Sequence, residues 1–238
     1  MTLDPRDAAL RMTCPVDSVP RFGPLEAMTN PGQRVLLAHN GVFLEVQRTW
    51  LNAVVRLSDL PHRPPLPFGE VTERVRFAFG VIPIPLLEDF IRAGKDALPN
   101  EAAGALVYST STKKLRLVLH EAIRTSPSRI NYRMPEIAAD EEIAVDLHTH
   151  GAGRAFWSDL DDLDDQCVKV CGVFGRLRGN TPDAAFRLVV NGHFKPLAHP
   201  WERVKERASE ALDSEERWPT LNSIGFARIE HSGTFDLP

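Results

Sequence analysis

Ile143-Ala-Val-Asp-Leu-His148-Thr-His150 has the pattern of a β-strand, and the rest of the chain is organised around it. Side chains alternate along a strand with a period of two, so His148 and His150 are predicted to project from one face. Two glycines in the following segment can turn the chain. Ser158 then provides a favourable helix N-cap, and Asp161 follows three residues later on the same side of the predicted helix.

This spacing brings together side chains that suit a metal ion. Two imidazoles and one carboxylate are ligands that Zn²⁺ accepts, and three protein ligands leave the fourth tetrahedral position open for water. An open position is typical of a catalytic zinc site rather than a structural one. We therefore predict one Zn²⁺ per chain, held by His148, His150 and Asp161.

The pattern His-x-His-x7-Ser-x2-Asp resembles the metal-binding motif of the JAMM (JAB1/MPN/Mov34) metallopeptidases, and His148, His150, Ser158 and Asp161 match it. The family motif also contains an upstream glutamate. Here Asn100-Glu101-Ala-Ala-Gly104 is similar to the family's Glu-x-x-Gly pattern. The chain departs from the family at Gly151, where a proline usually follows the second histidine; the change loosens the loop but removes no ligand.

The resemblance covers residues 80–200 and implies an α/β fold. The expected architecture is a mixed central β-sheet flanked by helices, of the JAB/MPN, cytidine-deaminase-like kind. It also implies roles for the site residues. His148, His150 and Asp161 would hold the zinc, Glu101 would move a proton from water to the leaving amine, and Ser158 would hydrogen-bond the oxyanion.

The family resemblance further implies a substrate. Its members cleave a peptide or isopeptide bond next to the C-terminal tail of a ubiquitin-like or sulfur-carrier-like protein. In finer detail, the Ala-Ala-Gly after Glu101, a Ser-Pro-Ser segment at 126–128 and Arg187-Leu-Val-Val-Asn-Gly look most like protein A of the bacterial PRTRC cassette. That likeness suggests an E1-like, ThiF-related protein as a partner.

Composition narrows the class of protein. The chain has 238 residues, 43% of them hydrophobic and 25% charged, which is ordinary for a globular protein with a substantial core. The formal charge of −4 argues against nucleic acid as a partner. The apolar run Phe77–Leu87 is too short for a bilayer and is interrupted by prolines, and the N-terminus lacks a signal-peptide pattern. These features predict a cytoplasmic protein with no membrane association.

Three parts are predicted along the chain. Residues 1–75 form a β-rich N-terminal unit, with a hairpin turning at His39-Asn-Gly41, and a proline-rich stretch from Pro61 follows it. Residues 80–200 form the JAMM-like domain, with an amphipathic helix from Pro85 to Leu98 that leads to Glu101. Residues 201–238 contribute a surface helix, at 201–212, and a tail.

Two further predictions concern segments near the site. Residues 121–141 contain Ser-Pro-Ser and Met-Pro-Glu and are predicted to be irregular or partly extended, as an insertion beside the site. Cys14, Cys167 and Cys171 are too few for a disulfide framework. The pair Cys167 and Cys171 lacks a partner pair at zinc-finger spacing, which favours small buried hydrophobic residues over ligands.

Two other functions remain open from the sequence. Asp146-Leu-His-Thr-His-Gly151 also resembles the opening metal motif of the PHP-type phosphoesterases and of amidohydrolases. Those enzymes are barrels with more ligands on later strands, and the chain after His150 is short for one. The second alternative is a non-catalytic MPN-like scaffold that binds a partner, although such scaffolds usually lack the ligand set that this sequence retains.

Overall fold

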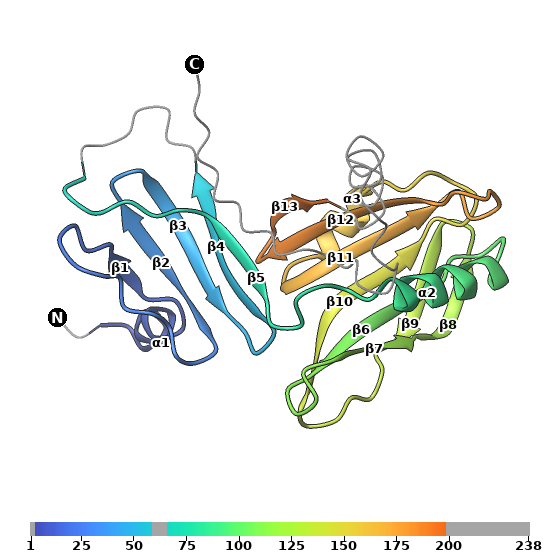
Figure 1. Ribbon diagram of the computed structural model, residues 1–238, viewed down its shortest axis with the longest axis horizontal. Helices are drawn as coiled ribbons and strands as arrows, with labels where there is room; N and C mark the ends of the chain where they lie inside the picture. The colour runs from blue at the N-terminus through green and yellow to red at the C-terminus, as the bar shows by residue number, and fades with distance from the viewer. Residues whose placement is uncertain (1–2, 59–65, 199–238) are drawn as a thin grey trace, which may run out of the picture. The chain divides into compact units, whose positions relative to one another are not determined.

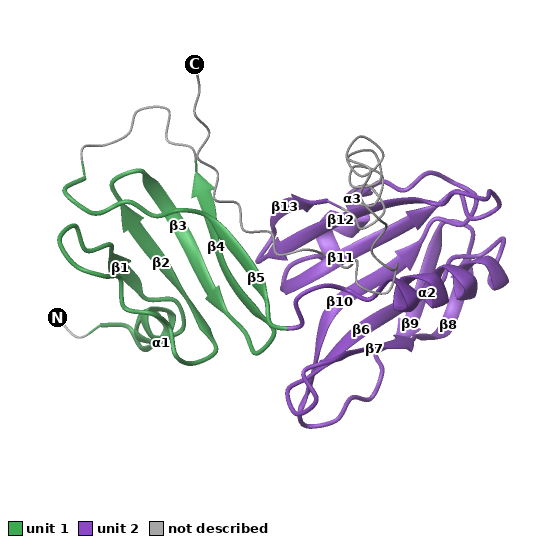
Figure 2. Cartoon of the chain, viewed as in Figure 1, with its two compact units in different colours: residues 1–78, 228–238 green, residues 79–227 purple. Residues whose placement is uncertain are grey.

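The computed structural model describes residues 3–58 and 66–198 (Figure 1). The predicted helix at 201–212, the tail to residue 238 and most of the proline-rich stretch from Pro61 lie outside the described residues. Within those ranges, the residues up to Ala78 form one compact unit and the residues from Phe79 onwards form another (Figure 2).

The N-terminal unit is a helix and a five-stranded sheet with the strand order β1-β2-β3-β4-β5. Its hairpin turns at the predicted place, with His39 and Asn40 between the paired residues Ala38 and Gly41, and Gly41 adopts a φ of 145°. The elements are α1 (Pro5–Thr13), β1 (Val16–Ser18), β2 (Gly32–Ala38), β3 (Gly41–Gln47), β4 (Leu51–Ser58) and β5 (Arg74–Phe77).

A buried carboxylate joins three strands of this unit. Glu45 of β3 is 1% exposed, and its two oxygens accept from Arg34 of β2 at 2.8 Å and from Arg74 of β5 at 2.6 Å. A charge this deeply buried is tolerated only when it is paired and hydrogen-bonded. The pairing therefore ties β5 to the middle of the sheet.

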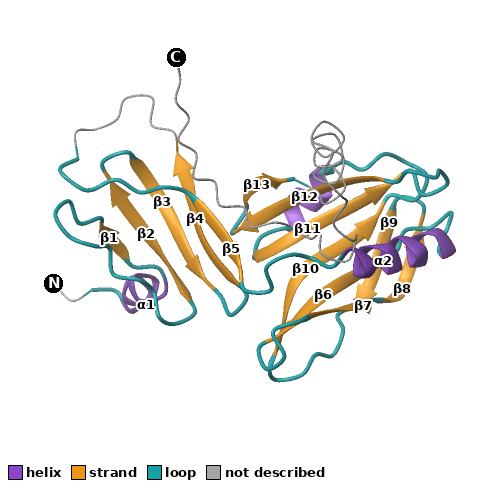
Figure 3. Ribbon diagram, in the orientation of Figure 1, coloured by secondary structure: helices purple, strands orange, loops and turns teal. Residues whose placement is uncertain are grey.

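The second unit is built on a mixed six-stranded sheet with the order β13-β12-β11-β10-β6-β7. Among the described residues, a two-stranded hairpin, β8–β9, and the helices α2 and α3 accompany it, and strands dominate over helices there (Figure 3). The elements are α2 (Ile84–Asp96), β6 (Ala103–Ser109), β7 (Leu115–Leu119), β8 (Glu121–Ser126), β9 (Arg129–Arg133), β10 (Glu141–Thr149), α3 (Asp159–Asp164), β11 (Val168–Gly175), β12 (Asp183–Val190) and β13 (His193–Leu197).

The sheet is mixed because one neighbouring pair, β10 and β11, runs parallel while the other pairs are antiparallel. Parallel strands need a long crossover connection. Residues 150–167, which include α3, make that connection. The prediction of a mixed sheet in an α/β arrangement is confirmed, although the unit is richer in strands than the expected layers of flanking helices.

The two faces of this sheet differ in chemistry because strand side chains alternate. One face is apolar and is covered by α2, whose Phe90 lies 5.5 Å from Phe174 between ring centroids. On the other face, the register aligns Asp146, Cys171 and Arg187 in one row across β10, β11 and β12. His148 and His150 follow Asp146 at intervals of two and share this polar face.

Two predictions about local structure are confirmed only in part. Residues 121–141 were expected to be irregular or partly extended. Residues 121–133 are extended and form the β8–β9 hairpin, in which the Ser-Pro-Ser stretch makes the turn and the Ser126 hydroxyl donates to the Arg129 carbonyl, whereas residues 134–140 belong to no helix or strand. Cys171 is buried as expected, whereas Cys167 is exposed because it lies in the connection just before β11. No helix in the described ranges is both long and apolar enough to cross a bilayer.

Candidate metal centre

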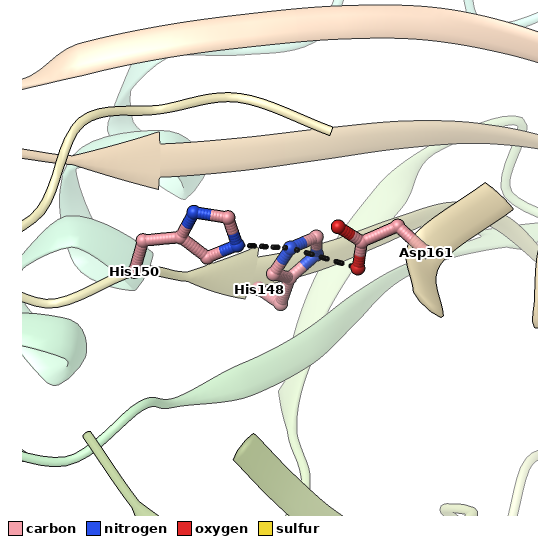
Figure 4. Close-up of side chains that lie close together, drawn as sticks. All are labelled: His148, His150 and Asp161. Atoms are coloured by element: carbon pink, nitrogen blue, oxygen red, sulfur yellow. Dashed lines mark hydrogen bonds and ion pairs between the residues drawn. The ribbon is translucent and has the colours of Figure 1, made fainter. Parts of the chain in front are cut away.

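The two histidines lie at the end of β10, on the polar face of the sheet. The Nε2 atoms of His148 and His150 are 3.2 Å apart, and the two rings are inclined at 50° to each other (Figure 4). The Nδ1 atom of His150 lies 3.2 Å from the Arg154 carbonyl oxygen. A carbonyl can only accept, so Nδ1 carries the proton and the lone pair of Nε2 is directed toward His148.

Asp161 is brought to the histidines by α3. Ser158 is the N-cap of this helix, as predicted, and it forms a capping box with Asp161. The Oδ2 atom of Asp161 accepts from the Ser158 backbone N–H at 2.7 Å and from its hydroxyl at 2.6 Å. The other oxygen, Oδ1, is 3.4 Å from His148 Nε2. The capping box thus fixes the orientation of the carboxylate.

Glu101 reaches the same place through the register of β6 and β10. Ala103 pairs with His148 in the antiparallel ladder, which sets Glu101, two residues earlier, opposite His150. Thr149 secures this end of the pairing: its N–H donates to the Ala102 carbonyl, and its hydroxyl accepts from the Ala102 N–H, both at 2.9 Å. Glu101 is consequently held beside the histidines although it is distant in sequence.

The connection between the histidines and Ser158 is pinned to the end of β11. Leu177 donates to the Gly151 carbonyl at 2.9 Å, and Arg176 donates to the Gly153 carbonyl. Gly151 has a φ of 53°, which proline cannot adopt. The loop that the glycine was expected to loosen is held here by backbone hydrogen bonds. Gly175 of β11 lies against the backbone of the connection before Ser158, so close that a Cβ at this position would be 2.3 Å from the Ala155 nitrogen.

Burial and neighbouring polar groups shift the pKa values of the site residues. Burial lowers the pKa of His148, which favours the neutral imidazole. Burial alone would raise the pKa of Asp161, but its electrostatic interaction with the adjacent His148 ring and hydrogen bonds from Ser158 outweigh burial and lower that pKa. Neutral imidazoles and an ionised carboxylate are the forms that bind metals. Glu101 is 8% exposed, and burial, with the charge of Asp161, raises its pKa to about 7.

The donor atoms fit a zinc ion. His148, His150 and Asp161 each offer one ligand atom, and these atoms lie within 4.8 Å of one another. The set of two imidazole nitrogens and one carboxylate oxygen matches the preference of Zn²⁺ and leaves a coordination position for water or substrate. Cys171 lies nearby, but burial raises the pKa of its thiol and so disfavours the thiolate that a metal would need.

A pocket of about 150 Å³ opens over these residues. Its walls come from the β8–β9 turn, β9, β10, α3 and β11, together with Glu101. The five residues predicted for the site, which are Glu101, His148, His150, Ser158 and Asp161, all line it. The ring of Tyr132, from the segment predicted to be irregular or partly extended, stacks on His120 with 4.2 Å between centroids and forms part of the wall.

A network of charge pairs, most of them largely buried, lies beside the pocket and was not predicted from the sequence. Arg187 contacts Asp162 and Asp165, and Lys169 lies 2.9 Å from Asp165 and 2.7 Å from Asp146. A signal was present in the sequence, because Arg187 and Lys169 each stand within an otherwise apolar run of residues. A charged residue in such a run indicates a buried polar partner.

Comparison with known proteins identifies the two parts of the chain. A family model of prokaryotic homologues of the JAB domain matches residues 83–189, and one described as a domain of unknown function (DUF2016) matches residues 4–78. A comparison with curated proteins gave no match. Among solved structures, a protein from Desulfitobacterium hafniense, determined in solution, is 17% identical with a TM-score of 0.37 over 47% of this chain and 85% of its own.

A TM-score of this size does not establish a shared fold, so the family assignment comes from the sequence match. The matched residues include the glutamate, the two histidines, the serine and the aspartate of the site. Residues 83–189 of this chain therefore belong to the JAB domain family.

Proposed function

We propose that this protein is a zinc-dependent hydrolase that cleaves a peptide or isopeptide bond next to the C-terminal tail of a ubiquitin-like or sulfur-carrier-like protein. The observation that carries the proposal is the convergence of three metal donors and one buried glutamate in a single pocket. JAB domains commonly bind zinc, and the donor set fits that ion.

Bound zinc would supply a Lewis acid that polarises the scissile carbonyl and lowers the pKa of water from 15.7 to about 7. Glu101 would act as the general base and then as the general acid, taking a proton from the attacking water and delivering it to the leaving amine. A pKa of about 7 suits both steps near neutral pH. Its position opposite His150 puts the carboxyl group beside the metal donors.

Ser158 would have two roles. In this structure its hydroxyl donates to Asp161, which orients the ligand carboxylate. The oxyanion role implied by the JAMM resemblance requires the hydroxyl to turn from Asp161 toward the pocket. The Ser158 backbone N–H would continue to hold Asp161 during that turn, because it donates independently to the same oxygen.

The charge of the pocket favours a peptide substrate over a phosphate ester. Five carboxyl groups line it: Glu101, Asp146, Asp161, Asp164 and Asp165. Two cationic side chains also line it, Arg129 and Lys169, and the charge of Lys169 is already matched by Asp146 and Asp165. The carboxyl groups outnumber the cations, which disfavours a phosphate dianion. Within the described residues, one cluster offers metal donors, whereas the phosphoesterase alternative needs further ligands on other strands.

The substrate and partner rest on the family resemblance. The small pocket suits an extended chain with small side chains better than a folded surface. An E1-like partner is a further part of the proposal and is supported by the short patterns shared with protein A of the PRTRC cassette. The non-catalytic scaffold remains the competing function, because it would use the same fold to bind such proteins without cleaving them.

The test uses the full chain loaded with zinc. Its probes are a bacterial sulfur-carrier protein fused at its C-terminus to a fluorescent protein, and diubiquitin joined through a lysine side chain. We expect cleavage of at least one probe, its loss after chelation or His148→Ala, and no cleavage by Glu101→Gln despite bound zinc. Glu136→Gln, at an exposed position, is the matched control and should cleave normally.

Three results would contradict the proposal. Cleavage by Glu101→Gln at the wild-type rate would remove the assigned base. Binding of both probes without cleavage by the zinc-loaded protein would favour the scaffold. Release of phosphate from p-nitrophenyl phosphate, without cleavage of either protein probe, would favour the phosphoesterase.

A further inference from the structure

Helix α3 carries a metal donor, yet apolar packing does not hold it in place. It has six residues, none of them buried, and its leucines Leu160 and Leu163 are 44% and 71% exposed. A helix this short is not stable alone, and a surface helix normally owes its position to an apolar face against the core. Something else must fix α3, because the position of Asp161 depends on it.

The guanidinium of Arg187 supplies that attachment. Arg187 stands on β12 with its side chain 5% exposed, and it donates to Asp162 at 2.5 Å and to Asp165 at 2.7 Å. Asp162 lies in the first turn of α3, and Asp165 is its C-cap. Both contacts are bonds between charged groups, which are the stronger class of hydrogen bond.

Two aromatic rings hold the guanidinium itself. Its central carbon lies 4.0 Å from the centroid of Trp157 and 4.1 Å from that of Phe194. Trp157 directly precedes the N-cap Ser158, and its ring also lies edge-on to His148 with 6.1 Å between centroids. Arg187 therefore contacts the chain on both sides of Asp161, before the helix and along it.

The attachment continues to the strand that bears the histidines. Asp165 also pairs with Lys169 at 2.9 Å, and Lys169 pairs with Asp146 at 2.7 Å. Asp146 lies on β10 two residues before His148. A chain of charge pairs thus runs from β12 through the end of α3 and β11 to β10, and it joins the elements that carry the predicted ligands.

We propose that Arg187 is a positioning residue for the metal centre, holding α3 against the sheet so that Asp161 reaches the two histidines. The inference rests on the metal-binding part of the proposed function and is independent of the substrate. The proposal predicts a change in zinc affinity opposite in direction to the change that electrostatics alone would cause. Removing a positive charge near a cation site should strengthen cation binding, whereas loss of positioning should weaken it.

The experiment compares the full-length wild type with Arg187→Met and Arg187→Lys. The methionine keeps an unbranched stem without the charge, and the lysine keeps the charge without the two-pronged contact. Arg116→Met is the matched control, because Arg116 makes a two-pronged pair with Glu141, at 2.6 Å for both contacts, away from α3. Zinc affinity is measured by competition with a chromogenic chelator, and ligand geometry by the visible absorption spectrum of the cobalt(II)-loaded protein.

We expect both Arg187 variants to bind zinc about 10- to 100-fold more weakly and to show an altered cobalt spectrum. Arg116→Met should match the wild type in both measurements. A purely structural role would lower the melting temperature but leave the cobalt spectrum of the folded protein unchanged. Wild-type zinc affinity and spectrum in the Arg187 variants, or tighter binding by Arg187→Met, would overturn the proposal.

If Arg187→Met does not fold, Arg187→Lys decides by the same two measurements. Failure of the proposed function is distinguishable, because in that case the wild type itself would bind neither zinc nor cobalt.

Discussion

Replacing Glu101 by glutamine should stabilise the metal-free protein at alkaline pH while removing its proposed activity. Glu101 is buried beside Asp161, and its pKa is raised from 4.5 to about 7. In the folded protein above pH 7 the carboxylate is therefore ionised at a cost that the unfolded chain does not have. Glutamine fills nearly the same volume without the charge, so it removes that cost.

The size of the effect follows from the pKa difference. A shift of about 2.5 units corresponds to about 3 kcal/mol at 1.36 kcal/mol per unit. Solvent entering the pocket screens the charge, and we expect about half of this value, roughly 1.5 kcal/mol. Because the folded-state pKa of this acid is raised, the wild type loses this stability as pH rises from about 4.5 to 7. The variant should lack that dependence.

Calorimetric unfolding in the presence of a chelator measures the difference. At pH 8 the variant should melt roughly 3–6 °C higher than the wild type, and the gap should close toward pH 4.5. Glu136→Gln, at an exposed position, should change the melting temperature little. A Glu101→Gln protein that is less stable than the wild type at pH 8 would refute the reasoning, because the carboxylate would then have a favourable partner or full hydration.

Three further substitutions test other parts of the account. Gly175→Ala should displace the loop before Ser158 and weaken zinc binding in a chelator competition, because its Cβ would fall 2.3 Å from the Ala155 nitrogen; Gly23→Ala, with nothing within 4 Å, should have no effect. Glu45→Gln should destabilise the N-terminal unit by about 1–3 kcal/mol in urea unfolding, because it removes the buried carboxylate that pairs with the buried Arg34 and the partly exposed Arg74, although Arg34 keeps its contact with Asp17. Phe90→Ala should cost about 3–5 kcal/mol through the cavity left under α2, and a loss below about 1 kcal/mol would contradict that packing.

Local patterns predicted much of the fold. Three features that depend on a few neighbouring residues are present in the structure. They are the alternation around His148, the hairpin turn at His39-Asn-Gly41 and the N-cap at Ser158. The amphipathic helix was predicted at 85–98 and is found at Ile84–Asp96. Such features are readable because backbone sterics and short-range hydrogen bonds decide them.

Features with a distant partner, or with an interrupted local pattern, were not predicted. The short β1 has little pattern of its own and forms because it pairs with β2. The β8–β9 hairpin is local, but Pro127 and the serines beside it, which form its turn, obscured the strands on either side. As a charged residue in an apolar run, Arg187 indicated a buried polar partner. Its partners, Asp162 and Asp165, lie in α3 and at its C-cap, and the pattern of the strand could not identify them.

The same distinction applies to the site. His148, His150, Ser158 and Asp161 lie within fourteen residues, so spacing alone could group them. Glu101 was placed by the resemblance to the JAMM motif, and the physical reason appears only in the structure, as the register that pairs Ala103 with His148. Register across strands distant in sequence is set by the whole sheet.

The most direct test of the central claim is the zinc content of the purified full chain, measured by mass spectrometry after exhaustive dialysis. We expect one zinc per chain in the wild type and close to none in His148→Ala and in Asp161→Ala, with both variants folded. Equal zinc in the wild type and in these variants would contradict the assignment of His148, His150 and Asp161 as a metal centre.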